Sequence, residues 1–181
     1  MKKAFTMLEL IFVIVVMGII IAVVTPNTRS NPAAEAAVEL QSQIRYAQHL
    51  AMVDDQYDGA DANWFKNRWQ VVIDDNNLTI QSENGTVFAS DTLATDRPLS
   101  RDYEKKYGVT VSSSDTDCPM ISGVFYLSFD HIGRPLIGDL NDYATPLAHL
   151  LTNNCTITIA GNGVTVTVDI MPETGFVKAI F

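Results

Sequence analysis

The chain has 181 residues, of which 12 are Lys or Arg and 21 are Asp or Glu, and its net charge is −9. This length is enough for one domain with a hydrophobic core and an appendage, but it is short for two full domains. The negative charge argues against a surface that neutralises nucleic-acid phosphates, so we expect no nucleic-acid partner.

The first predicted element is an apolar helix over residues 5–25, which we expect to cross a membrane. Between Phe5 and Val24 only one threonine, one glycine and Glu9 interrupt the apolar side chains. Twenty residues that rise 1.5 Å each span about 30 Å, the thickness of a hydrocarbon core. Two lysines precede the run, and the positive-inside bias predicts that they stay cytoplasmic while the C-terminal body is exported.

A cleaved secretory signal peptide is the alternative for this segment, because it also combines a basic start with an apolar run. The run here is longer than the usual apolar region of about 7 to 15 residues. No A-x-A pattern precedes a polar mature start. We therefore favour a helix that is retained.

The stretch KKAFTMLEL resembles the class III signal of type IV pilins and pseudopilins. In that family a short basic leader ends in a small residue, Phe follows the cut, and Glu is the fifth mature residue. These positions are Ala4, Phe5 and Glu9 here, with Ala4 where Gly is usual. The resemblance implies that residues 1–4 are a leader, and that prepilin peptidase cuts after Ala4 and methylates the Phe5 amine. It also implies a single-pass protein of the bacterial inner membrane with its C-terminal head in the periplasm, with other pilin subunits and an inner-membrane assembly platform as partners.

Glu9 needs a physical explanation of its own within the apolar run. A carboxylate in a membrane helix costs about 2.5 to 3.5 kcal/mol, and the run contains no Lys, Arg or His to pair with it. Cleavage after Ala4 creates a cationic amine at Phe5, which on a neighbouring chain can pair with Glu9 and set the axial register of a filament. The plainer alternative is a glutamate at the helix end that reaches the lipid headgroups.

The apolar run ends at Pro26, where we expect a kink because proline removes a helix hydrogen bond. Helical periodicity resumes from Pro32, with apolar residues on one stripe. The sequence thus predicts an amphipathic continuation of the same long helix over residues 26–53, packed on a sheet. The stripe consists of Ala37, Leu40, Ile44, Ala47 and Ala51.

Residues 54–181 are predicted to form a β-rich periplasmic head. Short β-branched runs follow one another without long helices between them, which favours an antiparallel sheet. The turns DNN and AGNG indicate hairpins. The fold class is therefore α+β, with a long N-terminal helix on a mainly antiparallel sheet. The pilin resemblance implies the same fold, and LQSQIRYAQHLAM, WQVVID, FDHIGRPL and VDIMPETGFVKAIF resemble the H-type minor pseudopilins and the fimbrial T-type minor pilins.

Cys118 and Cys155 are the only cysteines. In an oxidising exported compartment an even pair predicts a disulfide, and the alternative is two separate buried thiols.

Asp54 and Asp58 imitate the first half of a calcium-binding loop. The bidentate glutamate expected at the twelfth position is Phe65, so we expect a solvated acidic loop and no metal, with calcium as the alternative.

No hydrolase, metalloprotease or phosphate-binding motif occurs, so we predict neither enzymatic activity nor a cofactor. The aromatic and basic stretch around Trp64 and Trp69 favours packing over base stacking. These observations together predict a minor subunit of a type II secretion pseudopilus or a type IV pilus. The alternative is a membrane-anchored or secreted periplasmic binding domain that does not polymerise.

Overall fold

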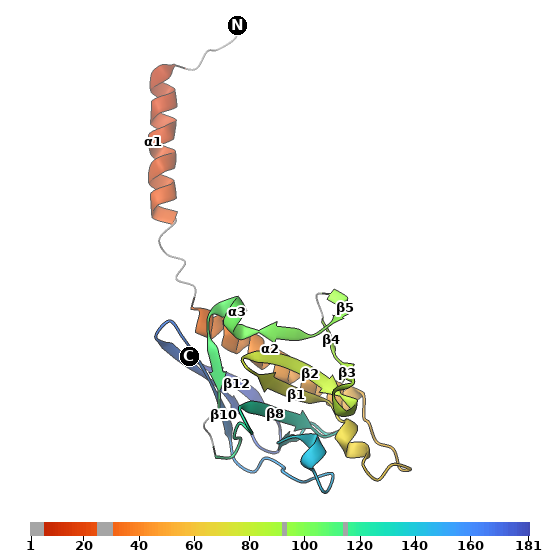
Figure 1. Ribbon diagram of the computed structural model, residues 1–181. Helices are drawn as coiled ribbons and strands as arrows, with labels where there is room; N and C mark the ends of the chain where they lie inside the picture. Colours follow the sequence, from red (N-terminus) through yellow and green to blue (C-terminus); the bar gives the residue numbers. More distant parts are fainter. Residues whose placement is uncertain (1–5, 25–30, 92–93, 114–115) are drawn as a thin grey trace. The chain divides into compact units, whose positions relative to one another are not determined.

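The computed structural model describes residues 6–24, 31–91, 94–113 and 116–181 (Figure 1). The chain divides into two compact units, Met1–Asn31 and Pro32–Phe181. The first unit contains helix α1 (Met7–Val24). The second unit, which we call the body, contains helix α2 (Pro32–Val53) and all the sheets. The amphipathic helix therefore belongs to the same unit as the strands.

The prediction of one long N-terminal helix is wrong. The structure has two shorter helices, α1 and α2, and α2 begins at Pro32. Proline lacks the N–H that a continuing helix would need and is favoured at the first helical position, so Pro32 starts a new helix. The predicted kink at Pro26 lies outside the described residues.

The predicted membrane span over residues 5–25 is also wrong. Within the described parts of the chain, no helix combines the length and the hydropathy needed to cross a membrane. The 18 residues of α1 span about 27 Å, less than the roughly 30 Å of a hydrocarbon core. This finding overturns the transmembrane helix and the single-pass placement in the inner membrane.

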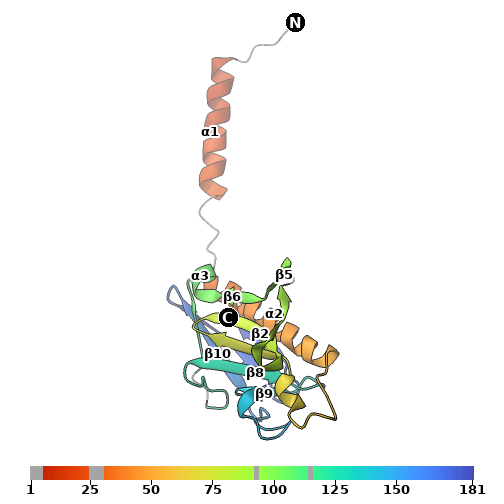
Figure 2. The ribbon, with the colours of Figure 1, turned by 45° about the vertical axis from the view of Figure 1, so that its right-hand side comes forward.

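Every strand pairing among the described residues is antiparallel, and the body is rich in sheet. The larger sheet has the order β3-β2-β1-β8-β9, with β6 also paired to β2. Figures 1 and 2 show β1, β2 and β8 side by side. Its strands are β1 (Gln70–Asp74), β2 (Asn77–Ser82), β3 (Val87–Phe88), β6 (Ser100–Asp102), β8 (Val124–Phe129) and β9 (Pro135–Ile137).

The second sheet has the order β12-β11-β10-β7 and contains the C-terminal strand. Its strands are β7 (Thr110–Ser112), β10 (Cys155–Gly161), β11 (Val164–Ile170) and β12 (Val177–Ile180). A small ribbon pairs β4 (Ser90–Asp91) with β5 (Ala94–Pro98). Short helices complete the body: η1 (Trp64–Asn67), η2 (Glu83–Gly85), α3 (Tyr103–Tyr107) and η3 (Leu140–Asp142).

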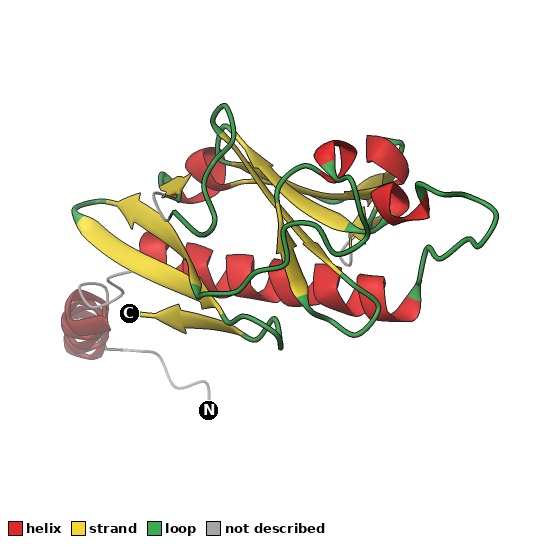
Figure 3. Cartoon of the chain, turned by 90° about the horizontal axis from the view of Figure 1, so that it is seen from below, coloured by secondary structure: helices red, strands yellow, loops and turns green. Residues whose placement is uncertain are grey.

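Helix α2 packs against strands of both sheets, which makes it the central element of the core (Figure 3). The predicted apolar stripe is confirmed, because all five of its residues are buried. Five of the seven buried residues of α2 are alanines, and such small side chains let the strands approach the helix closely. The buried residues are Ala33, Ala36, Ala37, Leu40, Ile44, Ala47 and Ala51.

Both predicted hairpins are present. Asp75 and Asn76 join β1 to β2, and Asn162 and Gly163 join β10 to β11. All four residues have positive φ, between 46° and 75°, as a two-residue turn of this kind requires. Asp, Asn and Gly tolerate this conformation better than other residues do, which explains why the turn sequences carried a usable signal.

Candidate functional site

The α1 helix begins with a cap that the sequence analysis did not predict. The Glu9 amide lies 3.3 Å from Thr6 Oγ1, so the threonine side chain accepts a hydrogen bond from the third helical residue. Thr6 and Glu9 have the T-x-x-E spacing of a capping box, and this spacing was the signal that could have revealed the cap. Glu9 also places a negative charge at the positive end of the helix. The structure thus gives Glu9 a local role at the start of α1.

Apolar side chains cover α1 on every side, and every side chain of the helix whose burial is described, from Met7 to Ile21, is exposed. The exposed fraction of the large apolar side chains from Met7 to Ile21 runs from 36% at Val16 to 82% at Met7. Glu9 is the only charged residue of the helix. Gly18 has no side chain, and a Cβ at this position would meet no described atom within 4 Å. A helix that is apolar all round is stable when other apolar surface covers it.

The predicted processing site lies outside the described residues. Ala4 and Phe5, the residues on the two sides of the predicted cut, fall within residues 1–5. Cleavage and methylation of Phe5 stay predictions.

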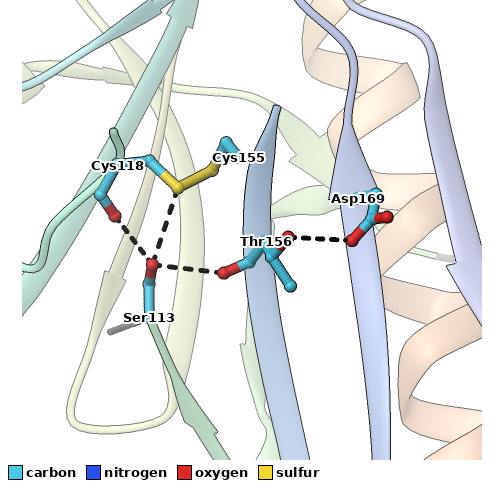
Figure 4. The surroundings of a disulfide bond; sticks show 5 residues. All are labelled: Ser113, Cys118, Cys155, Thr156 and Asp169. Carbon is cyan, nitrogen blue, oxygen red and sulfur yellow. Dashed lines mark hydrogen bonds between the residues drawn. A yellow bond between two sulfur atoms is a disulfide. The ribbon is translucent and has the colours of Figure 1, made fainter. Parts of the chain in front are cut away.

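The predicted disulfide is confirmed: Cys118 and Cys155 are bonded, with their Cα atoms 5.4 Å apart (Figure 4). Cys155 begins β10, while Cys118 lies in the segment that follows β7. Ser113 Oγ lies 2.7 Å from the Cys118 carbonyl oxygen and 3.3 Å from that of Thr156, which ties the same segment to β10 a second time. The bond closes a loop with a sequence separation of 37 residues, and such a closure stabilises a fold by about 4 kcal/mol in the chain-entropy model.

The two calcium candidates, Asp54 and Asp58, have other partners. Asp54 Oδ2 accepts hydrogen bonds from Trp69 Nε1 at 2.9 Å and from Gln56 Nε2 at 2.8 Å. Asp58 Oδ1 accepts one from the Ala60 amide at 2.8 Å. No group of three or more potential metal ligands comes together in the described parts of the chain. Asp54 therefore anchors the loop after α2 to the start of β1.

The aromatic and basic stretch packs into the body. Phe65 and Trp69 are buried, and the Arg68 guanidinium stacks over the Trp64 ring at 4.7 Å from its centre. Arg68 also donates to the Pro146 carbonyl oxygen, and burial lowers its pKa. These rings are consequently not arranged as a platform for bases.

A cavity of about 390 Å³ opens at one end of the body, and nothing in the sequence analysis predicted it. Three segments line it: residues 116–121 beside the disulfide, residues 137–143 around η3, and residues 149–152. The last segment runs along β9, because the Ile137 amide donates to the His149 carbonyl oxygen at 3.0 Å and Leu136 bridges to Leu150. The cavity is thus built from positions far apart in the chain, which explains why no local pattern revealed it.

An aromatic pair forms part of this lining. The rings of Tyr143 and His149 stack with their centres 5.0 Å apart and their planes 29° from parallel. Tyr143 Oη donates to the Ile137 carbonyl oxygen at 3.1 Å, and burial raises the pKa of this tyrosine. His149 has a φ of 61°, a conformation in which histidine is found more often than most residues. In this pair the buried Tyr143 is held by its hydrogen bond, and His149 is exposed.

Comparisons with known proteins do not place the chain in a family: no family model matches it, and neither curated proteins nor solved structures contain a match.

Proposed function

We propose that this chain is a minor subunit of a filament of the type IV pilus or type II secretion pseudopilus kind, and that it joins other subunits through α1. The observation that carries this proposal is the surface of α1, which is apolar on every side, exposed from Met7 to Ile21 and interrupted by a single carboxylate. An exposed apolar surface of this extent is typical of an interaction site.

Other α1-like helices would cover this surface in a bundle. Burial of apolar area stabilises such a bundle by about 25 cal/mol per Å². Burial gives no axial register by itself, because apolar contacts are non-directional. Glu9 supplies an axial register, because a charged group in an apolar bundle is stable only opposite a partner of opposite charge. The Phe5 amine created by leader cleavage is that partner in the proposed assembly.

The T-x-x-E cap offers a competing explanation of Glu9, and one pair of variants separates the two roles. Glu9→Gln keeps a side chain that suits the capping box but removes the charge. Thr6→Ala weakens the cap, by about 1 kcal/mol, but keeps the charge. If the charge sets the register, we expect Glu9→Gln to reduce incorporation into filaments at least about tenfold, because a lost ion pair worth about 1.4 kcal/mol has this effect. We expect Thr6→Ala to be incorporated nearly as well as the parent chain.

The experiment expresses each variant in cells with a prepilin peptidase and an assembly system, and quantifies the subunit in sheared filaments. The thermal unfolding of each variant serves as a control, because Glu9 and the body belong to separate units. Normal incorporation of Glu9→Gln would refute the register role. The filament proposal itself fails if Ile14→Cys, at an exposed α1 position, gives no cross-link to another subunit.

The alternative function is a secreted binding domain that does not polymerise, and the cavity in the body is the observation that favours it. The intact mass of the chain recovered from the same cells distinguishes the two functions. A mature chain that begins at methylated Phe5 supports the filament subunit. A chain that begins near Asn27, or one that retains Met1, supports the alternative.

A further inference from the structure

We propose that the cavity of the body binds the side chain of an arginine presented by a partner protein. Its volume of about 390 Å³ lies within the range of small-ligand sites, about 300 to 1,000 Å³. The site does not depend on α1, and it goes beyond the proposed assembly function.

The charges around the cavity are of one sign. Asp117, Asp139 and Asp142 line it, and no Lys or Arg is found among the described residues of the lining. Three carboxylates in one opening attract a cation and repel an anion. The net charge of −9 strengthens this selection, because the rest of the chain adds to the negative potential.

The carboxylates are positioned rather than loosely exposed. Asp139 caps η3, and its Oδ1 accepts hydrogen bonds from the Asn141 amide at 2.9 Å and from Asn141 Nδ2 at 3.0 Å. These two contacts use one oxygen of the carboxylate, which leaves Oδ2 able to accept from a ligand. Asp117 Oδ1 accepts from Asn153 Nδ2 at 3.1 Å, and the disulfide at the adjacent Cys118 holds this wall in place.

The remainder of the lining suits a ligand side chain that has an apolar stem and a flat head group. Ile121, Ile137 and Leu150 give the cavity apolar walls. The His149 ring is exposed and stacks on the buried Tyr143 ring, so its outer face offers a flat surface of the kind on which a guanidinium packs. Gly138 also lines the cavity, and its φ of 110° disfavours a residue with a side chain at this position. An arginine side chain combines all three properties: a stem, a planar head and a permanent positive charge.

Three blocked peptides test the site on the full chain: acetyl-Gly-Arg-Gly-amide, the same peptide with citrulline, and the same peptide with norleucine. Citrulline keeps the shape of arginine without the charge, and norleucine keeps only the apolar stem. We expect the arginine peptide to shift NMR resonances of the cavity residues, to bind at least about tenfold more tightly than the citrulline peptide, and to weaken as the salt concentration rises.

Protein variants assign this binding to the cavity. Asp139→Asn keeps a residue that caps a helix well, so η3 should remain folded. We expect the double variant Asp139→Asn with Asp142→Asn to lose the preference for arginine over citrulline. Asp55→Asn, at an exposed carboxylate outside the lining, is the matched control and should keep it.

Several results would overturn the proposal. Equal affinity for all three peptides would mean an apolar pocket without charge recognition. Shifts confined to residues outside the cavity would mean diffuse attraction to an acidic surface. Tighter binding of free spermidine than of the arginine peptide would mean that the ligand is a small amine and not a protein side chain. No shift at millimolar peptide would mean that the cavity does not bind this group.

Discussion

Tyr103 and Tyr143 are both buried, but only one of their hydroxyl groups has a hydrogen-bond partner. Tyr143 Oη donates to the Ile137 carbonyl oxygen, whereas Tyr103 Oη has no partner among the described residues. A buried hydroxyl without a partner loses its hydrogen bonds to water and gains none in exchange. The two side chains have the same chemistry and similar burial, so they form a matched pair for measuring that loss.

Replacing each tyrosine with phenylalanine should therefore change stability in opposite directions. We expect Tyr103→Phe to raise the free energy of unfolding by up to about 1 kcal/mol, because it removes an unsatisfied group and little else. We expect Tyr143→Phe to lower it by about 1 to 2 kcal/mol, because it leaves the Ile137 carbonyl oxygen without this donor. Urea unfolding at pH 7 measures both. A loss of stability in Tyr103→Phe would show that its hydroxyl is satisfied in solution.

The same tyrosine makes the stability of the body sensitive to alkaline pH. Burial raises the pKa of Tyr103 above its ordinary value of 10.0, and the nearby Glu39 carboxylate raises it further. The unfolded chain ionises this group near pH 10, while the folded chain keeps it neutral. The stabilisation is therefore complete below pH 10 and is lost as the pH rises above 10 towards the pKa of the folded state.

We expect the parent chain to lose about 1.4 kcal/mol more stability than Tyr103→Phe between pH 8 and pH 11, because one group then ionises only in the unfolded state. Chemical unfolding at the two pH values gives the four free energies needed. Equal losses in the two chains would mean that Tyr103 ionises as readily in the folded body as in the unfolded chain.

Helix α2 is held to two turns of the body by one glutamine. Gln48 Nε2 donates to the Gly133 carbonyl oxygen and to that of Thr174, both at 2.9 Å. Gly133 lies in the β8–β9 turn, and Thr174 lies in the turn before β12. The three elements therefore meet at a single amide. The turns approach each other so closely that a Cβ on Gly175 would lie 2.5 Å from the Gly133 oxygen.

Gln48→Ala should lower the free energy of unfolding by about 2 kcal/mol, since it removes two hydrogen bonds worth about 1 kcal/mol each. Gln43→Ala is the matched control, because the Gln43 side chain makes no hydrogen bond with a described residue, and it should cost less than about 0.5 kcal/mol. Thermal unfolding compares the two. Equal effects would show that helix propensity, not the contact to the turns, decides the result.

Local patterns predicted the elements of the body better than their lateral arrangement. The stripe of α2 and the two hairpins follow from residues close together in the chain, and all three are present. The pairing of β1 with β8 joins residues 50 to 58 positions apart, and periodicity carries no information about such partners. The short strands β3, β4, β6 and β9 lack enough residues for a period to appear.

The two corrections to the predicted fold have separate origins. The membrane span rests on the apolar length of residues 5–25, whereas the described helix is the 18 residues Met7–Val24; the single long helix rests on treating residues 26–53 as a continuation, whereas Pro32 begins a new helix. The helix that contains Glu9 ends at Val24, and the next begins at Pro32. The cavity was missed for a different reason: it is lined by three segments that only the folded body brings together, and its carboxylates come from two of them.

The division of the chain into two units predicts that stability and association are separable properties. The body has its own core, its own disulfide and the helix that packs on both sheets. The other unit contains an apolar helix whose large side chains are exposed from Met7 to Ile21. We therefore expect a chain of residues 32–181 to unfold within about 2 °C of the full chain, a shift equivalent to less than about 1 kcal/mol, and to remain monomeric when the full chain self-associates.

Light scattering after size exclusion, together with calorimetry, measures both properties on the two chains. Ile14→Lys in the full chain is the control that leaves the length unchanged. It places a charge in the middle of the exposed surface of α1, so it should reduce association without altering the unfolding temperature. If residues 32–181 associate as the full chain does, the surface responsible belongs to the body, and α1 is not the assembly element. If they fail to fold, the body depends on the first unit for its stability.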